Sequence, residues 1–470
     1  MQLYVEMCNT IKENKMIKKI SKKTSLLSAL VLTMALFVGC SNEQNSKEEV
    51  TSTETKTIAT KELQEKLNDE SWVVVDTRIN DAFNGWKLDD VSRGGHIKGA
   101  VDFSANWLSV DAKDKDKTLE KALETKGIDK DKNIVLYDAN GKDAKEVASY
   151  LSEKGYSNLY TYDIADWAND ETLPMESYEK YDMLVPATIV NDVLEGKKPE
   201  TFENSKNIKV VEASWGEESE AYSKGHVPTS VHINTDTIEP PPAWMLASDE
   251  ELAKFANDYG FTKDDTVIVT GPDVMASYRV AVVLRYIGIN DVRVLNGGND
   301  AWINAGYELE TKSNKPVAGN NFGTKIPGNP DLIDTQDELK EMLKDSNNVL
   351  VDNRSWDEYI GKVSGYSYHD KKGRIPGAVY GYAGTSSTTL EDYRNIDNTM
   401  RNADEIKALW KKAEIDTNKH MIFMCGSGWR AAEVLTYANV MGFENTSLYS
   451  DGWIGWSNNT SNPTETGEPK

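Results

Sequence analysis

The chain contains the stretch Val349-Leu350-Val351-Asp352, a short apolar run that ends in a carboxylate. The same pattern occurs twice more, at Val73-Val74-Val75-Asp76 and at Val210-Val211-Glu212. A short helical pattern precedes each run, and the third of these helices opens with Thr335 and Glu338 at the spacing of a capping box. The three predicted helices span residues 61–67, 187–194 and 336–343. A helix followed by a buried strand therefore begins a unit that occurs three times.

Each unit continues in the same order. A glycine-containing turn comes first, at residues 95–100, 225–230 and 373–378. A second strand follows, predicted over 134–137, 267–269 and 421–424, and then a longer helix, predicted over 144–154, 277–286 and 431–441. Each unit closes with a tryptophan-bearing turn, at residues 166–167, 297–302 and 451–456. Strands that alternate with helices at this spacing predict an α/β fold, with a parallel sheet covered on both faces.

Length and composition agree with several folded domains. At roughly 100 to 200 residues per domain, 470 residues predict two to four domains. The chain has 53 Lys and Arg against 76 Asp and Glu, a net charge of −23, which argues against electrostatic binding of nucleic acid. The 12 tryptophans and a hydrophobic content of 39% indicate that most of the chain folds.

These motifs together resemble the rhodanese family of sulfurtransferases. The resemblance rests on the Asp-x-Arg pattern after the first strand, the glycine turn, the loop between second strand and helix, and the tryptophan turn, repeated over residues 60 to 460. It implies three tandem rhodanese-like domains, each a small parallel sheet flanked by helices. We place them at residues 60–176, 184–311 and 331–462.

The third unit carries a distinctive loop, Cys425-Gly426-Ser427-Gly428-Trp429-Arg430, between its second strand and its longer helix. Such a loop can turn successive N–H groups inward beside the positive end of a helix, and this favours the nucleophilic thiolate form of cysteine. The first unit has Asp138 in this register, and the second has the sequence 270–275 without cysteine. Only the third unit is therefore predicted to be catalytic.

The resemblance assigns roles to the residues of this loop. Cys425 is the expected nucleophile, which takes sulfur from a donor such as thiosulfate or 3-mercaptopyruvate and passes it to cyanide or a thiol. Arg430 is the second candidate catalytic residue, as a cation near the sulfur; alternatively, it pairs with a distant carboxylate to hold the helix. Gly426, Ser427, Gly428 and Trp429 are candidate substrate-binding residues.

Residues outside the loop receive weaker assignments. Arg374 replaces the histidine found in the other two glycine turns, His96 and His226, and is a candidate for binding an anionic donor. Asp352 and Arg354 are predicted to be structural. The insertion 366–368 either walls the pocket or is a surface loop. No zinc cluster, P-loop or nucleotide motif occurs in the sequence, so we expect no metal and no cofactor.

Two alternatives to a sulfurtransferase are consistent with a cysteine in such a loop. Related phosphatases have a longer loop between cysteine and arginine, whereas Cys425 and Arg430 are separated by the four residues typical of sulfurtransferases. The other alternative is a non-catalytic protein that binds or senses sulfane sulfur and stores a persulfide on Cys425. Turnover with a donor and an acceptor separates this role from catalysis.

The first 59 residues differ from the repeats. Four lysines precede an uncharged stretch, residues 24–39, which is typical of a signal peptide and ends in Val38-Gly39-Cys40. This ending resembles a bacterial lipobox, so residues 1–40 are predicted to be a lipoprotein signal in which Cys40 is lipidated; a plain secretory signal is the alternative. Residues 41–59 are predicted to be a polar tether. We therefore expect attachment to the cell membrane on its extracytoplasmic side.

Overall fold

A computed structural model describes residues 55–469 of the chain. The predicted lipidation site Cys40, the signal segment 1–40 and most of the predicted tether lie outside the described residues. None of the helices within 55–469 is long and apolar enough to cross a membrane. The first repeat begins earlier than predicted, because Lys56–Thr57 at the end of the predicted tether forms an edge strand. The sequence does not reveal this strand, since backbone pairing at an edge needs no apolar side chains.

The first repeat is built on a five-stranded parallel sheet of order β1-β6-β5-β2-β4. Its strands are β1 (Lys56–Thr57), β2 (Trp72–Asp76), β4 (Val101–Asp102), β5 (Asn133–Asp138) and β6 (Leu159–Asp163). A separate antiparallel pair joins β3 (His96–Ile97) to β7 (Met175–Glu176). The helices are α2 (Thr60–Lys66), α3 (Asn80–Asn84), α4 (Lys115–Thr125), α5 (Asp143–Glu153) and α6 (Ile164–Ala168).

The second repeat has a parallel sheet of order β10-β9-β11-β12-β8. Its strands are β8 (Leu184–Val185), β9 (Ile208–Ser214), β10 (Val231–Asn234), β11 (Thr266–Thr270) and β12 (Asp291–Leu295). Its helices are α7 (Ala187–Leu194), α8 (Asp249–Asp258), α9 (Val274–Ile287) and α10 (Gly298–Asn304).

The third repeat has a parallel sheet of order β13-β17-β16-β14-β15. Its strands are β13 (Ile333–Asp334), β14 (Asn348–Asp352), β15 (Val379–Tyr380), β16 (His420–Met424) and β17 (Thr446–Tyr449). Its helices are α11 (Gln336–Met342), α12 (Trp356–Tyr359), α13 (Ala403–Lys412), α14 (Trp429–Val440) and α15 (Gly452–Asn458).

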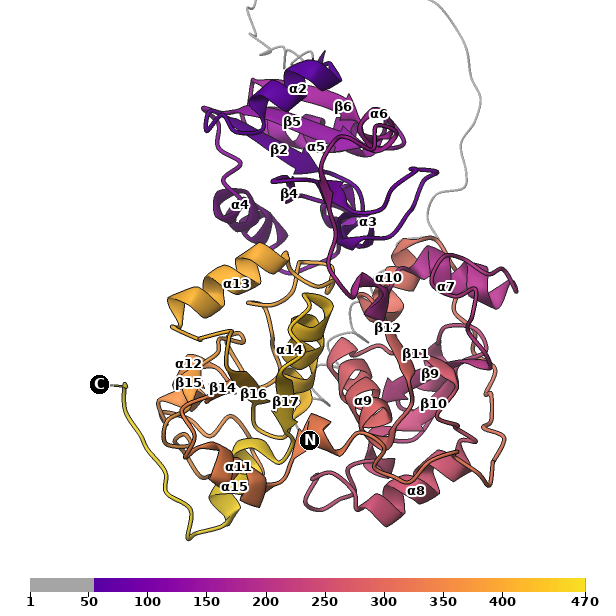
Figure 1. Ribbon diagram of the computed structural model, residues 1–470, viewed down its shortest axis with the longest axis vertical. Helices are drawn as coiled ribbons and strands as arrows, with labels where there is room; N and C mark the ends of the chain where they lie inside the picture. Colours follow the sequence, from indigo (N-terminus) through magenta and orange to yellow (C-terminus); the bar gives the residue numbers. More distant parts are fainter. Residues whose placement is uncertain (1–54, 470) are drawn as a thin grey trace, which may run out of the picture. The chain divides into compact units, whose positions relative to one another are not determined.

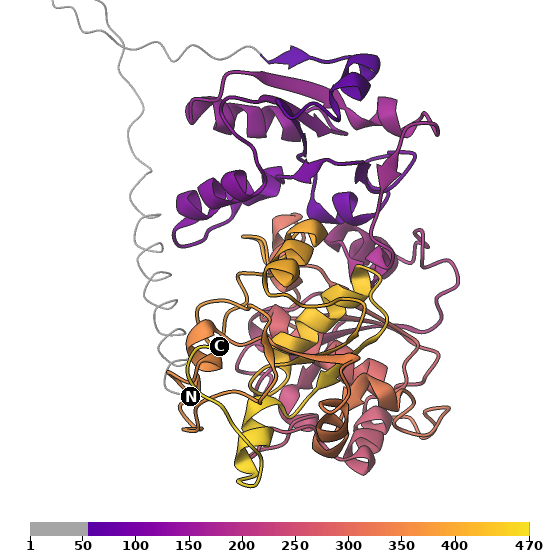
Figure 2. The ribbon, with the colours of Figure 1, turned by 60° about the vertical axis from the view of Figure 1, so that its left-hand side comes forward.

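The three sheets share one topology, which confirms the predicted fold class. In each sheet the strands lie in the same spatial order when numbered within their own repeat, and all neighbours are parallel. Helices cover both faces of each sheet, as the two views show (Figures 1 and 2). Parallel strands need such crossover helices, which explains why the apolar runs in the sequence are continuous rather than alternating.

Helices α9 and α14 connect the cores of the second and third repeats. They pack against each other, and the rings of Tyr278 and Tyr437 meet edge to face at 5.2 Å between centroids. Nearly every residue of both helices is buried, and the two helices belong to one continuous hydrophobic cluster. The helix that follows the cysteine loop is therefore packed on one side by the second repeat.

The six helices predicted from the sequence are all present, and the structure adds others: α3 and α12 were not predicted, and α6, α10 and α15 stand where tryptophan-bearing turns were predicted. The capping box of Thr335 and Glu338 is present at the start of α11, as predicted. Helices α4, α8 and α13, which lie between the glycine turn and the second strand of each repeat, were missed. They are rich in charged residues and bury only a narrow apolar stripe, so that tertiary packing has to identify them.

Candidate active site

Cys425 stands at the carboxyl end of the central strand of the third sheet. It directly follows β16, and α14 begins at Trp429 after a short loop. The cysteine residue is 2% exposed. In parallel sheets the carboxyl ends of strands and the amino ends of the following helices meet at one edge, where binding sites of α/β proteins lie. The loop predicted from the sequence is therefore located where such a site forms.

The backbone of this loop is held by the turn that begins α15. The N–H of Trp453 donates to the carbonyl of Cys425 at 2.8 Å, and the N–H of Ile454 donates to the carbonyl of Gly426 at 3.0 Å. In a trans peptide plane the N–H points opposite to the carbonyl, so the N–H groups of Gly426 and Ser427 face away from this turn. The loop thus offers successive backbone donors on one side, the arrangement that accepts anions.

The first turn of α14 leaves its backbone N–H groups open to a ligand. Gly428, at the cap position, has a φ of +90°, a left-handed conformation that favours glycine. A Cβ atom at this position would also lie 2.8 Å from the carbonyl oxygen of Ser450. Among the described residues, no side chain caps this helix end by hydrogen bonding. The positive end of α14 therefore adds to the backbone donors around Cys425.

Arg430 forms a buried, two-pronged ion pair with Glu358. Its Nη1 and Nη2 atoms each donate to a carboxylate oxygen of Glu358 at 2.9 Å, and further bonds reach the carbonyl of Ser386 and the hydroxyl of Tyr366. Burial alone would raise the pKa of Glu358, but the charge and hydrogen bonds of Arg430 outweigh it and hold the pKa below its ordinary value. The geometry is the carboxylate pairing that was the alternative interpretation of Arg430.

Aromatic side chains cover the cysteine loop. A Cβ atom at Gly426 would overlap the hydroxyl of Tyr366, so only glycine permits this ring to lie on the loop. The ring of Tyr368 is 5.4 Å from that of Tyr366 and 5.4 Å from that of Trp244, which comes from the second repeat. Burial raises the pKa of Tyr366, so its hydroxyl is protonated at neutral pH. The insertion 366–368 therefore walls the site.

The remaining loop residues predicted to bind substrate face different partners. The indole Nε1 of Trp429 donates to a carboxylate oxygen of Glu239, in the second repeat, at 2.6 Å. Ser427 is partly exposed at the middle of the loop. Trp429 is thus engaged with the neighbouring repeat, and substrate binding by Ser427 stays a prediction.

Asp352 and Arg354 form a buried pair at the end of β14. The guanidinium of Arg354 donates to both carboxylate oxygens of Asp352, at 2.8 Å and 2.6 Å, and to the carbonyl of Gly373 at 2.9 Å. Both side chains are fully buried. In this position the pair ties the strand end to the glycine turn, a structural arrangement.

Arg374 is engaged with the C-terminal segment. Its backbone N–H donates to the carbonyl of Glu465, its guanidinium lies 3.2 Å from the Glu465 carboxylate, and its Nη1 donates to the carbonyl of Gly467 at 2.5 Å. The guanidinium also stacks on the ring of Tyr359, 5.0 Å from its centroid. These contacts hold the C-terminal segment against the third repeat, and donor binding by Arg374 stays a prediction.

The equivalent loops of the other two repeats contain a carboxylate that binds the start of the following helix. In the first repeat, Asp138 follows the same register and accepts the N–H of Ala144, in the first turn of α5, at 3.0 Å. In the second, Asp273 accepts the N–H of Met275, in the first turn of α9, at 3.0 Å. Each repeat without a thiol therefore fills the anion-accepting helix end with a side chain of its own.

The sheet register corrects one detail of the sequence alignment. Glu212 pairs with Thr270 in the second repeat just as Asp352 pairs with Met424 in the third, so Gly271, not Thr270, stands at the position of Cys425. The N–H of Asn299 accordingly donates to the carbonyl of Gly271 at 3.0 Å. The sequence alignment was wrong by one residue here, because α9 begins one residue closer to its preceding strand than α14 does.

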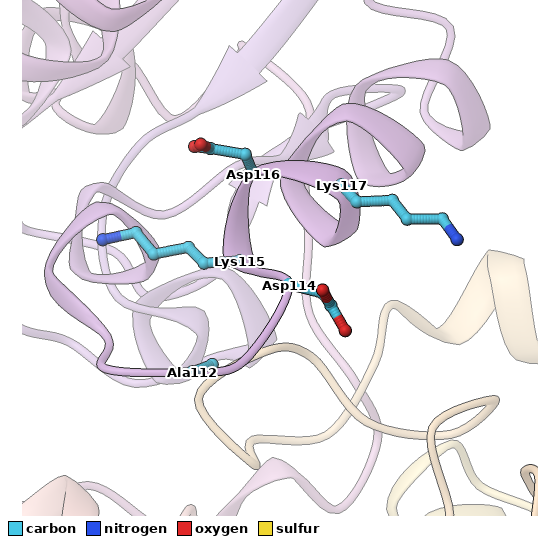
Figure 3. A pocket seen from close by; sticks show the side chains of 5 residues that line it. All are labelled: Ala112, Asp114, Lys115, Asp116 and Lys117. Carbon is cyan, nitrogen blue, oxygen red and sulfur yellow. The ribbon is translucent and has the colours of Figure 1, made fainter.

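A hollow elsewhere on the chain does not compete with this site. It has a volume of about 640 Å³ and is formed by a single segment at the start of α4, with the lining residues Ala112, Asp114, Lys115, Asp116 and Lys117. Figure 3 shows that its charged side chains point away from one another. Within residues 55–469, no group of three or more metal-ligating side chains is placed to hold an ion. The side chains of this hollow therefore do not converge on a point where a substrate could react.

The sequence did not indicate several residues of the site. They are Glu358 and Ser386, which bind Arg430, and Trp244, Glu239 and Arg279 of the second repeat, the last of which donates through Nη2 to the hydroxyl of Ser450 at 2.7 Å. Glu358 lies four residues after Arg354 and completes a capping box with Ser355, a local signal that indicates a helix start and not an active-site partner. Glu239 and Arg279 belong to the second repeat, where no local pattern indicates contact with the cysteine loop. Long-range packing alone identifies them.

Comparison with known proteins identifies the family. The profile of the rhodanese-like domain matches the chain at residues 59–169, 200–305 and 335–459. The thiosulfate sulfurtransferase YnjE of Escherichia coli (strain K12) is 35% identical over 448 residues, which cover 95% of this chain and 98% of that protein. Bovine thiosulfate sulfurtransferase is 24% identical over 260 residues, or 53% of this chain and 84% of the relative. The chain belongs to the rhodanese family of sulfurtransferases.

Solved structures with similar folds include complexes of the enzyme EanB. The anaerobic ergothioneine biosynthesis enzyme from Chlorobium limicola, bound to its natural substrate trimethyl histidine, superposes with a TM-score of 0.83 and is 35% identical over 88% of this chain and all of that chain. A persulfide form of EanB with ergothioneine in a tetrahedral intermediate state gives the same TM-score, coverage and identity. The resemblance predicted from the motifs is thereby confirmed at the level of family and fold.

Proposed function

We propose that the protein is a sulfurtransferase that carries sulfane sulfur as a persulfide on Cys425. The observation that carries this proposal is the loop of the third repeat, where a thiol and an uncapped helix end occupy the place filled by Asp138 and Asp273 in the other repeats. Backbone donors stabilise a negatively charged sulfur without requiring a metal ligand set. The third repeat then carries the reacting sulfur, and the other two repeats have no thiol at this position.

With thiosulfate as donor, the reaction has two balanced steps. The thiolate of Cys425 attacks the outer sulfur, the bond between the two sulfur atoms of thiosulfate breaks, and sulfite leaves with the bonding electron pair. An acceptor nucleophile, cyanide or a thiolate, then attacks the outer sulfur of the persulfide and regenerates the Cys425 thiolate. The N–H groups of Gly426 and Ser427 are placed to stabilise the persulfide anion between these steps.

The charges around the loop bear on the choice of donor. Arg430 is neutralised by Glu358, Arg354 by Asp352, and Arg374 by Glu465. An anionic donor such as thiosulfate or 3-mercaptopyruvate would therefore depend on backbone N–H groups and the helix end more than on a free guanidinium. Tyr366 accepts a hydrogen bond from Arg430, which leaves its own O–H available as a donor to the bound sulfur group.

A second candidate acceptor is a trimethylated histidine, the substrate named for the similar enzyme from Chlorobium limicola. The aromatic cover of Trp244, Tyr366 and Tyr368 favours it, because aromatic faces attract quaternary ammonium groups. Anionic acceptors gain nothing from such a cover. The imidazole ring carbon would attack the outer sulfur of the Cys425 persulfide, the bond between the two sulfur atoms would break with Cys425 leaving as the thiolate, and the proton of that ring carbon would then be lost.

Turnover assays test the proposal and separate its alternatives. The protein lacking residues 1–40 is incubated with thiosulfate or 3-mercaptopyruvate and with cyanide, dithiothreitol or trimethyl histidine as acceptor. Multiple turnovers with any combination of donor and acceptor support a sulfurtransferase, and the combination with the highest rate identifies its preferred substrates. A persulfide that forms once but passes to no acceptor indicates the sulfane-sulfur store or sensor instead, and no persulfide with any donor contradicts both. The variant Cys425→Ser is the control for background transfer.

We further propose that the protein is a lipoprotein attached to the extracytoplasmic side of the cell membrane through Cys40. The lipobox-like ending at Cys40 and the uncharged stretch before it support this proposal. Fractionation of cells that express wild type and Cys40→Ala tests it. We expect the wild type in the membrane fraction and the variant released from it; a processed variant that stays membrane-bound would contradict lipid attachment.

A further inference from the structure

The second repeat places a buried ion pair against the cysteine loop of the third. Arg279, in α9, donates through Nε to a carboxylate oxygen of Glu239 at 2.8 Å, and its Nη2 lies 2.7 Å from the same oxygen. The two side chains are 0% and 3% exposed. Glu239 follows β10, at the carboxyl end of the second sheet. The pair therefore belongs to a repeat that has no thiol.

The remaining atoms of this pair reach both sides of the cysteine loop. The second carboxylate oxygen of Glu239 accepts the indole N–H of Trp429, the first residue of α14, at 2.6 Å. Nη2 of Arg279 donates to the hydroxyl of Ser450 at 2.7 Å. Ser450 directly precedes the turn whose N–H groups hold the carbonyls of Cys425 and Gly426. One ion pair thus fixes the exit of the loop and the turn that holds its backbone.

One atom of Arg279 is left over in this arrangement. Its Nη1 is buried and forms no hydrogen bond within the described structure, and it would lie 3.0 Å from a Cβ atom at Gly428. An unsatisfied buried donor and a buried charge both cost free energy, and an apolar pair could fill the same space more cheaply. A contribution to stability therefore does not explain why this ion pair is present. Its role in holding the cysteine loop in position does explain it.

We propose that Glu239 and Arg279 are positioning residues for sulfur transfer at Cys425, so that the thiol-free second repeat is part of the catalytic machinery. They act through Trp429 and Ser450, which set the position of the loop that receives the sulfur. This inference rests on the proposed persulfide chemistry. A small misplacement of such a loop is sufficient to lower the rate about a hundredfold.

Arg279→Met, Glu239→Gln and Ser450→Ala break the network at three different points. Arg78→Met is the matched control, because Arg78 forms an equally buried pair whose hydrogen bonds go to Asp76 and Gly95 inside the first repeat. The rate of Cys425 persulfidation by thiosulfate is measured in a single turnover, together with the rate of Cys425 alkylation by iodoacetamide against pH and a melting curve.

We expect Arg279→Met to slow persulfidation at least tenfold and to change the alkylation profile, whereas Arg78→Met lowers the melting temperature and changes neither rate. Ser450→Ala removes a single hydrogen bond and leaves both charges in place, so it should slow persulfidation by a smaller factor. This variant still tests the inference if Arg279→Met does not fold. Wild-type rates in Ser450→Ala and Glu239→Gln, or equal slowing in Arg78→Met, would overturn the inference. Absence of persulfide in the wild type would contradict the proposed function, while the alkylation profiles would still test the positioning role.

Discussion

The loops after β16 and after β11 share a backbone hydrogen bond at the strand end but differ in the groups that follow it. In both, the carbonyl at the strand end accepts an N–H from the closing tryptophan turn, at Cys425 in the third repeat and at Gly271 in the second. After Gly271, however, Pro272 lacks the N–H that Gly426 provides, and Asp273 caps the helix. The backbone at the strand end is therefore common to both repeats. The residues that follow it determine whether the backbone N–H groups at the helix start stay available to an anion.

Moving the thiol to a repeat that lacks one should have the largest effect. A Cβ atom at Gly271 would lie 2.4 Å from the carbonyl oxygen of Ala213, so the first repeat, where Asp138 holds the register of Cys425, is the suitable host. In a chain with Cys425→Ser and Asp138→Cys we expect complete loss of sulfur transfer, because the side chain of Asn140 accepts the N–H groups of Lys142 and Asp143 at the helix start. Turnover with thiosulfate and cyanide measures this, and Asp138→Cys alone is the control that should keep wild-type activity. Activity in the double variant would show that the thiol alone is sufficient.

The Asp-x-Arg pair offers the next contrast. Arg354 neutralises buried Asp352 in the third repeat, whereas the second repeat has Glu212 and Ser214 at these positions, with one oxygen of Glu212 lacking a hydrogen bond. Arg354→Ser should lower the free energy of unfolding by about 3–5 kcal/mol, because it leaves a buried charge unpaired. Urea unfolding measures the loss. A variant as stable as the wild type would show that this pair does not support the third repeat.

The unpaired acid of the second repeat should appear in the pH dependence of stability. Burial raises the pKa of Glu212 to about 7, from an ordinary value of 4.5. Between these values the unfolded chain releases its proton while the folded chain keeps it, so the free energy of unfolding falls as pH rises, by up to about 3 kcal/mol. The lower stability persists above pH 7.

Glu212→Gln isolates this effect, since glutamine does not titrate and the other acids cancel in the difference. We expect the variant to gain stability relative to the wild type as the pH rises from about 4.5 to 7, the interval set by the two pKa values. Urea unfolding of both proteins across this range provides the measurement. Stability curves that run parallel would mean that Glu212 is charged in the folded protein.

The smallest expected change in activity concerns the cation beside the thiol. Glu358→Gln removes the charge that neutralises Arg430 and should cost about 3–5 kcal/mol of stability, since it leaves the buried guanidinium without a counter-charge. It also frees a positive charge next to the loop, so the KM for thiosulfate should fall. Steady-state kinetics checks this, and an unchanged or raised KM would indicate that Arg430 does not meet the donor.

Most of the fold was predictable because its signals are local. Three apolar runs ending in an acid, three glycine turns and three strand–loop–helix units identify the repeats and a parallel sheet, whereas the order of the strands in each sheet was not predicted. The edge strand β1 and the helices α4, α8 and α13 were missed, since short edge pairing and narrow apolar stripes leave little trace in the sequence.

The site was predictable only in part. The loop from Cys425 to Arg430 has a local pattern, and its place at the strand end follows from it. The hydrogen-bond partners of Arg430 and Trp429 cannot be predicted from this pattern. Glu358 stands 72 residues before Arg430, and Glu239 stands 190 residues before Trp429. Such pairings depend on how α9 and α14 pack, which periodicity does not encode.

Mass spectrometry of the intact protein tests the central claim most directly. Wild type and Cys425→Ser, both lacking residues 1–40, are treated with thiosulfate, freed of excess donor and weighed, and cysteine peptides are then identified by fragmentation. We expect one added sulfur atom on Cys425 in the wild type, its removal by cyanide with formation of thiocyanate, and no adduct in the variant. An adduct that persists in Cys425→Ser would show that Cys425 does not carry the sulfur.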